Sequence, residues 1–237
     1  MLDNLKSKYI LQEIVEKIKN KRKLNIIKYN KRVMIKLDIN KEDFETYTIL
    51  KELNFKYNTN IQDIDIKTLN LSGKCIRNEG LKDLNKIKFK GINELNLEEN
   101  KISNINILEK VNFKKLNTLD LNSNEISDIN ILEKVNFKEL KELNLHGNKI
   151  SDINILEKVN FKELNKLDLS HNKISDIIIL EKVNFKELKE LYLSSNEILD
   201  INILAKVNFN ELKVLNLSGN KISDINILEK ANFKVIY

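Results

Sequence analysis

The stretch LKELNLHGNKISDINILEKVNFKE, from Leu140 to Glu163, decides the fold, because it recurs almost letter for letter along the chain. Successive copies open 24 residues apart, at Leu116, Leu140, Leu164, Leu188 and Leu212, after an earlier copy at Ile92. A looser copy opens at Ile66 and is two residues longer. Self-similarity at a fixed period of this length predicts a solenoid in which stacked copies share one core.

The first half of each copy follows the pattern LxxLxLxxNxI, whose positions are counted here from the first leucine. In the copy that opens at Leu140, Leu143 and Leu145 alternate with polar residues, which predicts a short, half-buried strand. One such strand cannot bury its apolar side alone. The strands of neighbouring copies are therefore expected to stack into a parallel sheet.

The second half of the copy, INILEKVNFKE, carries apolar residues at Ile153, Leu156, Val159 and Phe161. Their spacing of three, three and two residues predicts a short helical or 3-10 turn rather than a long helix. The phenylalanine recurs in every copy and is expected to form a stacked aromatic row inside the convex side. This row is Phe89, Phe113, Phe137, Phe161, Phe185, Phe209 and Phe233.

An asparagine stands at the ninth position of six copies. The backbone turns inward after each strand and would leave buried amides unpaired, and an asparagine side chain can satisfy them. The predicted ladder is Asn100, Asn124, Asn148, Asn172, Asn196 and Asn220, with Lys74 in the first copy.

This motif resembles the leucine-rich repeat, and its ISDIxxL continuation looks like the internalin and phosphatase-regulator classes of that superfamily. The resemblance covers seven copies, residues 66–237. It implies an α/β solenoid of the horseshoe type, with a parallel β-sheet on the concave face and short helical or 3-10 turns on the convex face. Curved solenoid interiors commonly bind other proteins.

Residues 1–65 contain no repeat, and we expect them to form a helical N-terminal cap over the open end of the solenoid. Leu5 opens an apolar stripe that runs to Ile18 at mostly four-residue spacing. Apolar residues from Phe44 to Leu53 recur every three residues, which predicts a helix over residues 41–53.

The same segment also resembles a degenerate F-box, a short helical module that docks onto a ubiquitin-ligase scaffold. The shared features are an acid-then-Ile helix (Glu13, Ile14), Leu24 in a second helix and the pair Lys31–Arg32. The family's Pro after the first apolar residue and its aromatic residue after the Lys-Arg pair are missing. The resemblance implies a substrate adaptor, in which residues 5–37 would dock the ligase and the repeats would hold the substrate.

Composition excludes several classes of protein. The charged fraction is 32%, and no apolar run approaches the ~20 residues that span a bilayer, so no membrane association is expected. The start, MLDNLKSKY, lacks the apolar region of a signal peptide, and Cys75 is the only cysteine, so we expect a cytoplasmic protein. The net charge of +6 comes from the N-terminal end without an Arg-rich run, which argues against nucleic acid as a partner.

The copies differ from one another mainly at the third, fifth, seventh and eighth positions, which should form the concave surface. From the second copy onward these positions hold seven acids and one lysine, a net charge of −6 on a chain of +6. Lysines such as Lys149 and Lys213 flank the strands, so we predict an acidic trough with basic rims. Such a trough would repel phosphate and attract a basic protein or peptide.

The partner-binding residues predicted for this surface are Glu94, Asn96, Glu98, Asp120, Asn122, Glu142, Asn144, His146, Lys166, Asp168, His171, Glu190, Tyr192 and Val214. Tyr192 is the only aromatic residue among them and, beside Val214, is the best hot-spot candidate. His146 and His171, the only histidines, occupy adjacent copies and are expected to approach each other near Asp168. Because histidines on a variable surface more often meet by coincidence, no metal site is predicted.

No nucleophile–base pair, glycine-rich phosphate loop or Cys/His cluster is present, so neither catalysis nor a cofactor is expected. The function predicted first is a protein–protein interaction module. The ubiquitin-ligase adaptor and a phosphatase-regulator-like scaffold are the alternatives. Ile236 stands where a next strand would begin, which predicts an open sheet edge. Three alternatives follow for this edge: a truncated chain, end-to-end self-association, or a minimal cover by Lys234 and Tyr237.

Overall fold

The computed structural model describes residues 41–61, 64–87, 89, 91–111 and 113–231. Contacts divide the chain into two compact units, Met1–Gln62 and Asp63–Tyr237. The F-box-like segment and the stripe from Leu5 to Ile18 lie outside the described residues, as does Phe233–Tyr237. The predicted cap and docking roles of residues 1–65 therefore stay predictions.

In the first unit, the described structure is helix α4 (Lys41–Tyr57) and the turn after it. Its buried residues Thr46, Leu50, Leu53 and Tyr57 recur at four, three and four residues, so they share one face of the helix. The helix is four residues longer than the predicted 41–53. It ends before Asn58, whose φ of 48° lies in the left-handed region that terminates helices.

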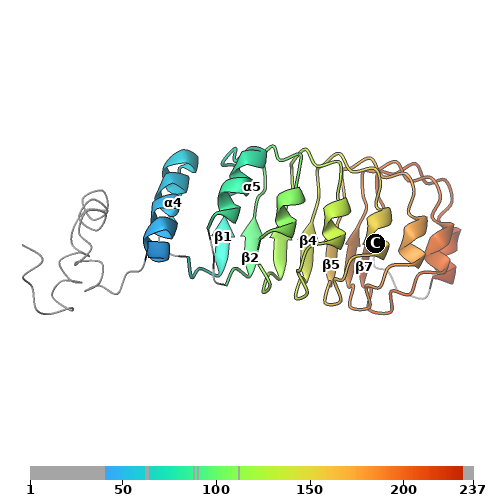
Figure 1. The fold of residues 1–237 in the computed structure, drawn as a ribbon. Coiled ribbons are helices and arrows are strands. Elements are labelled where there is room, and N and C mark those ends of the chain that lie inside the picture. The colour runs from blue at the N-terminus through green and yellow to red at the C-terminus, as the bar shows by residue number, and fades with distance from the viewer. Residues whose placement is uncertain (1–40, 62–63, 88, 90, 112, 232–237) are drawn as a thin grey trace, which may run out of the picture. The chain divides into compact units, whose positions relative to one another are not determined.

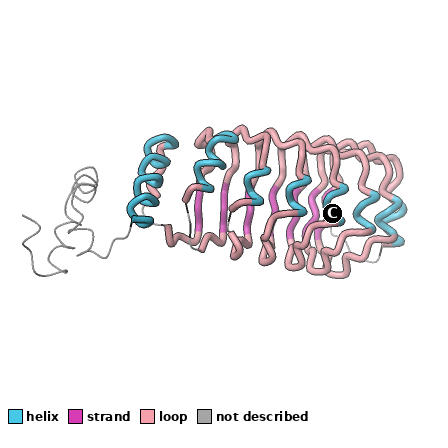
Figure 2. Tube along the Cα trace, viewed as in Figure 1, coloured by secondary structure: helices cyan, strands magenta, loops and turns pink. Residues whose placement is uncertain are grey.

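The second unit contains seven short parallel strands that lie side by side in chain order (Figures 1 and 2). Each pairs in register with the strand of the next repeat, and its central leucine is buried between two more exposed residues. The strands are β1 (Thr68–Asn70), β2 (Glu94–Asn96), β3 (Thr118–Asp120), β4 (Glu142–Asn144), β5 (Lys166–Asp168), β6 (Glu190–Tyr192) and β7 (Val214–Asn216). This architecture is the solenoid that the repeat predicted.

One short helix follows each strand, as Figure 2 shows. The first is the α-helix α5 (Arg77–Asn85), because the two extra residues of the first copy lengthen this arm. The others are 3-10 helices, as predicted: η2 (Asn106–Glu109), η3 (Asn130–Glu133), η4 (Asn154–Glu157), η5 (Ile178–Glu181), η6 (Asn202–Ala205) and η7 (Asn226–Lys230). Each begins two residues after an Asn or Asp whose side chain accepts the bond from its first amide, for example Asp152 with Asn154 at 2.8 Å.

The core lies between the sheet and these helices. In the copy that opens at Leu140, the apolar residues of the motif are all buried, from Leu143 and Leu145 on the strand to Leu156 and Phe161 on the return arm. The described members of the phenylalanine row are buried as predicted. Among the described members of this row, a ring-to-ring contact joins only Phe89 and Phe113, whose centroids are 6.4 Å apart. The row is therefore buried, but its rings do not form a continuous stack.

The asparagine ladder is confirmed. The side-chain nitrogen of Asn148 donates to the carbonyl oxygens of Leu121 and Leu145, both at 3.0 Å, and its oxygen accepts from the Ile126 amide at 3.0 Å. The other ladder members make equivalent bonds. Each asparagine thus joins two consecutive repeats through groups that would otherwise be buried without partners.

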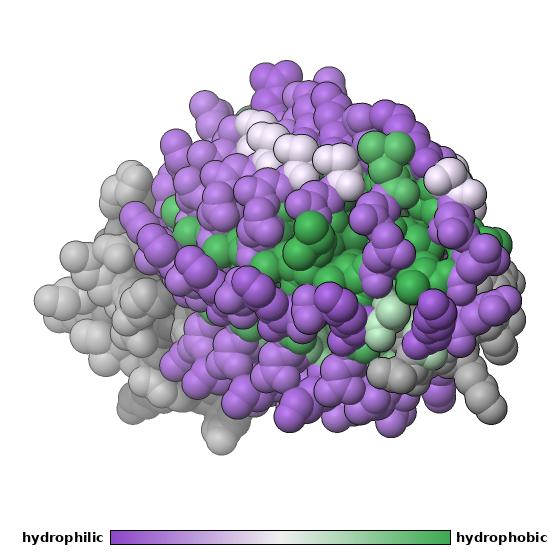
Figure 3. Space-filling view, turned by 90° about the vertical axis from the view of Figure 1, so that its right-hand side faces the viewer, coloured by the Kyte–Doolittle hydropathy of each residue, from purple (hydrophilic) through white to green (hydrophobic). Residues whose placement is uncertain are grey.

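Figure 3 looks onto the C-terminal end of the repeats, where a hydrophobic area lies between hydrophilic side chains. Among the described residues of the repeats, the exposed large apolar side chains are Ile178, Leu199 and Ile225. None of the described helices is both long and apolar enough to cross a bilayer.

Candidate functional site

All fourteen predicted partner-binding residues lie on the strands or in the turns directly after them. We call the surface made by the third, fifth and seventh positions of the repeats the strand face. It carries six carboxylates and one lysine over the seven repeats. The charged residues are Glu94, Glu98, Asp120, Glu142, Lys166, Asp168 and Glu190.

The carboxylates of the first repeats are held by neutral neighbours. The Glu98 carboxylate accepts hydrogen bonds from the Ser72 hydroxyl at 3.2 Å and from the Asn122 amide group at 2.8 Å. Glu94 accepts a bond from the Thr68 hydroxyl at 3.0 Å. Because these donors carry no charge, both carboxylates keep their negative charge available to a partner.

Asp120 lies between other acids on the strand face. Partial burial raises the pKa of its carboxyl above the ordinary value of 3.8, and repulsion from Glu98 and Asp168 adds to the increase. Hydrogen bonds from the Asn122 amide and from the Asn144 side chain lower this pKa, but by less in sum. A positively charged partner group at this point would relieve the repulsion among the three carboxylates.

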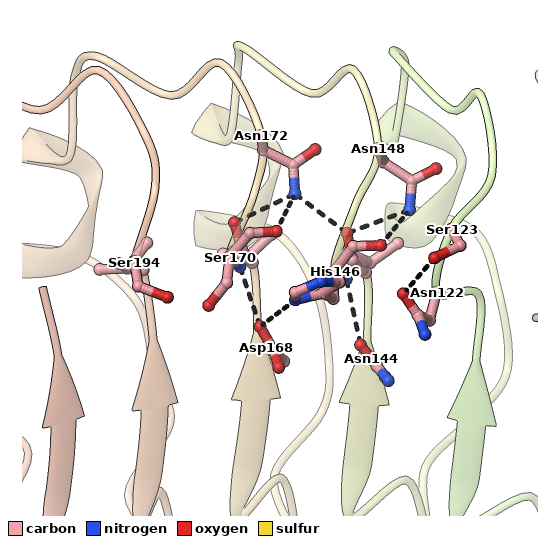
Figure 4. A network of polar contacts seen from close by, with 12 residues as sticks. Asn122, Ser123, Asn144, His146, Asn148, Asp168, Ser170, Asn172 and Ser194 are labelled. Carbon is pink, nitrogen blue, oxygen red and sulfur yellow. Dashed lines mark hydrogen bonds and ion pairs between the residues drawn. The ribbon is translucent and has the colours of Figure 1, made fainter. Parts of the chain in front are cut away.

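The two histidines meet as predicted. The ring centroids of His146 and His171 are 4.7 Å apart, and His146 Nδ1 is 4.0 Å from Asp168 Oδ1. Figure 4 shows His146 directed toward Asp168, beside the ladder residues Asn148 and Asn172. Among the described residues, no group of three or more His, Cys, Asp or Glu side chains is arranged to hold a metal ion.

Tyr192 lies in a cluster that joins two strands. Its hydroxyl donates to Glu190 Oε2 at 3.0 Å, and Lys166 Nζ lies 5.5 Å from the ring centroid and 3.3 Å from the same Glu190 oxygen. Partial burial and the bond to Glu190 raise the pKa of the Tyr192 hydroxyl, so it stays a protonated donor. Burial alone would lower the pKa of Lys166, but the attraction of Glu190 outweighs it and raises this pKa.

The residue at the fifth position has a structural role that comparing the repeat copies did not reveal. Its Asn or Asp side chain accepts a hydrogen bond from the backbone amide two residues later, as Asp168 does from Ser170 at 2.9 Å. Six of the seven repeats make this bond, through Asn70, Asn96, Asp120, Asn144, Asp168 and Asn216. The recurrence of Asn and Asp in this row was the available signal, because these residues favour such Asx turns.

The eighth position is also constrained by the backbone. Its residues have φ between 54° and 67°, in the left-handed region that favours glycine and disfavours β-branched side chains. His171 and Glu99 both adopt this conformation, with φ of 54°. The presence of glycine at this position in three repeats was the sequence signal. Variation among the copies is therefore freest at the third and seventh positions.

The basic rim of the trough is only partly basic. Lys149 pairs with Glu125 at 2.9 Å, and Lys221 pairs with Glu197 at 2.9 Å. These two glutamates share the tenth position with the lysines, and hydrogen bonds from their lysine partners lower the pKa of each carboxyl. Four lysines, Lys101, Lys149, Lys173 and Lys221, share this row with the two glutamates, so the row keeps a net charge of +2. The rim is basic on this side, but less so than a count of lysines alone indicates.

Models of the leucine-rich repeat family match three stretches of the chain. A two-copy leucine-rich repeat model matches residues 138–182 and 186–230, and a single-repeat model matches residues 114–129. No curated protein sequence matches the chain.

Solved structures with a similar fold include internalin C2 from Listeria monocytogenes strain 4b F2365. It has 23% identity and a TM-score of 0.51, over 79% of this chain and 91% of the internalin chain. Internalin InlF from the same strain has 21% identity and a TM-score of 0.30, over 81% of this chain and 73% of its own. The plant peptide hormone receptor RGFR1, solved in complex with RGF2, has 19% identity and a TM-score of 0.45, over 59% of this chain and 26% of its own.

Proposed function

Because the chain is a leucine-rich repeat protein, a class that commonly binds other proteins, we propose that it is a non-catalytic interaction module. Its partner is a protein or peptide with a basic surface, and its binding surface is the strand face. The charge of that face carries the proposal: six carboxylates and one lysine gather there on a chain whose net charge is +6.

Electrostatics favours a basic partner over nucleic acid. Within the third-position and fifth-position rows, carboxylates recur on every second strand, ~9.6 Å apart at the usual strand separation. This distance is close to the Debye length in physiological salt, so their potentials partly add along the row. A row of this sign attracts Lys and Arg side chains and repels phosphate. The raised pKa of Asp120 supports a negative potential on the strand face, because repulsion from Glu98 and Asp168 contributes to it.

A random-peptide display library panned on the purified full chain tests the proposal. We expect the wild type to enrich peptides rich in Lys and Arg. The triple variant Glu98→Gln, Asp120→Asn, Glu142→Gln should lose this enrichment, because it removes three charges while keeping a side-chain oxygen at each position.

The matched control is Glu133→Gln, Glu157→Gln, Glu181→Gln, which changes the net charge equally at exposed positions of the 3-10 helices. It should enrich the same peptides as the wild type. If both triple variants lose the enrichment of basic peptides equally, the net charge of the protein, and not the strand face, controls binding. Enrichment of acidic peptides, or tight binding of a labelled DNA duplex, would overturn the proposal.

A further inference from the structure

Tyr192 is the only residue at the fifth position of the seven repeats that is neither Asn nor Asp. In the other six repeats an Asn or Asp at this position accepts a bond from the amide two residues later. A tyrosine cannot reproduce that bond, so Ser194 alone among the described repeats lacks it. The scaffold therefore lacks at this repeat a hydrogen bond that the other six repeats make.

The Tyr192 ring is fixed in place. The bond from its hydroxyl to Glu190 holds the far end of the side chain, and Lys166 lies over the ring. Lys166 is itself held by Glu190 at 3.3 Å. A ring that such contacts already restrain loses less conformational freedom when a partner contacts it, which is the property of an effective binding anchor.

An apolar position lies on the next strand. Val214 is the only apolar residue at the third position, where the other repeats carry Thr, Glu or Lys. Tyr192 and Val214 line one side of a hollow of ≈ 600 Å³ at the C-terminal end of the repeats, whose other lining residues include Leu215, Leu217 and Ile222 of the last repeat. Toward the N-terminal repeats the surface becomes acidic, with Asp168, Glu142 and Asp120 on successive strands.

We infer that Tyr192 and Val214 form an apolar anchor site that fixes the orientation of a basic peptide on the strand face. The inference rests on the proposed function. The partner is an extended segment that places one apolar side chain at the anchor and its basic side chains over the carboxylates of the preceding repeats.

The geometry sets the spacing within that segment. Glu142 lies two strands from Tyr192 and Asp120 lies three strands away, which is ~10 and ~14 Å at the usual strand separation. An extended chain advances ~3.3 Å per residue. The basic residues that reach Glu142 and Asp120 should therefore stand about three and four positions from the apolar residue.

The test compares peptides enriched by the wild type with those enriched by Tyr192→Asn and by Val214→Thr. Both substitutions install a residue that other repeats carry at the same position, so the fold is expected to persist. The wild type should select peptides with one fixed apolar position and basic residues three to four positions from it. The two variants should keep the basic residues and lose the apolar preference.

A selected peptide, synthesised with a fluorescent label, should bind Tyr192→Asn at least roughly 30-fold more weakly than the wild type, which is the lower bound for an interface hot spot. Tyr192→Phe keeps the ring but removes the hydroxyl that Glu190 holds, so it should bind more weakly than the wild type and more tightly than Tyr192→Asn. If the wild type enriches basic peptides that share no fixed apolar position, the anchor site is overturned and the proposed function stands. The absence of basic enrichment would instead overturn the proposed function. An unchanged affinity of the Tyr192→Asn variant would also overturn the anchor.

Discussion

The side-chain nitrogen of Asn172 donates a hydrogen bond of 3.0 Å to the carbonyl oxygen of Leu145, a residue of the preceding repeat. The same nitrogen lies 3.0 Å from the carbonyl oxygen of Leu169 in its own repeat, and the side-chain oxygen accepts from the Ile150 amide at 2.9 Å. One buried side chain therefore satisfies backbone groups of two layers.

Replacing Asn172 with Ala should destabilise the repeats by about 2–4 kcal/mol, because it leaves several buried backbone groups without partners. Urea denaturation followed by circular dichroism measures the change. Asn154→Ala is the control: this asparagine is exposed, and the variant should stay within about 0.5 kcal/mol of the wild type. Equal midpoints for both variants would mean that the ladder does not stabilise the stack.

Phe161 is 2% exposed and fills the space between its sheet strand and the return arm. Phe161→Ala should cost about 3–5 kcal/mol, the usual range for removing a buried phenylalanine. Phe161→Leu should cost less, since it leaves a smaller cavity. A loss below about 1 kcal/mol for the alanine variant would show that the phenylalanine row does not support the core.

The carboxyl of Asp120 has a pKa raised above 3.8 in the folded protein, mainly by partial burial. Its ionised form is therefore less favourable in the folded than in the unfolded chain, which costs stability at neutral pH. This cost disappears as the pH falls through the folded pKa toward 3.8. Asp120→Asn should thus stabilise the protein at pH 7, by a fraction of a kcal/mol because the site is half-solvated, and the gain should fade in acid.

Thermal melts of Asp120→Asn and the wild type between pH 7 and pH 3.5 provide the measurement. Asp120→Ala removes the acceptor of the Asn122 amide together with the charge, so it should be less stable than Asp120→Asn. A stabilisation by Asp120→Asn that grows in acid would contradict the assignment.

Tyr192→Asn should stabilise the fold by about 0.5–1 kcal/mol, since the new side chain can accept the bond from the Ser194 amide. The reciprocal change, Asn96→Tyr, should destabilise by a similar amount, because it removes the existing 2.9 Å bond to the Glu98 amide. Differential scanning calorimetry of both variants tests the pair. A loss of stability in Tyr192→Asn would show that the tyrosine supports the scaffold.

The sequence was sufficient to predict the rows of the solenoid. An exact 24-residue period places equivalent residues of successive copies side by side, and the leucines alternate with polar residues over each strand. The meeting of His146 with His171 follows from that register. The end of α4 was missed because helix length depends on where the left-handed turn at Asn58 falls, which apolar spacing does not encode.

The sequence predicted where the candidate surface lies, but it did not show which of its residues have structural roles. Both the Asx turn at Asp168 and the left-handed backbone at His171 lie in rows that vary among the copies, so comparing copies placed them with the binding residues. Likewise, the neutralisation of Lys149 by Glu125 depends on the direction of two exposed side chains.

By itself the sequence determined the fold, the buried rows and the face that differs between repeats, because apolar periodicity and the repeat period are properties of the chain. Only the tertiary structure decided which of the differing residues the scaffold already uses. That distinction depends on side-chain bonds to backbone amides, whose geometry exists only once the strands are stacked. It leaves Tyr192 as the one fifth-position residue of the strand face whose side chain does not bond to the backbone amide two residues later.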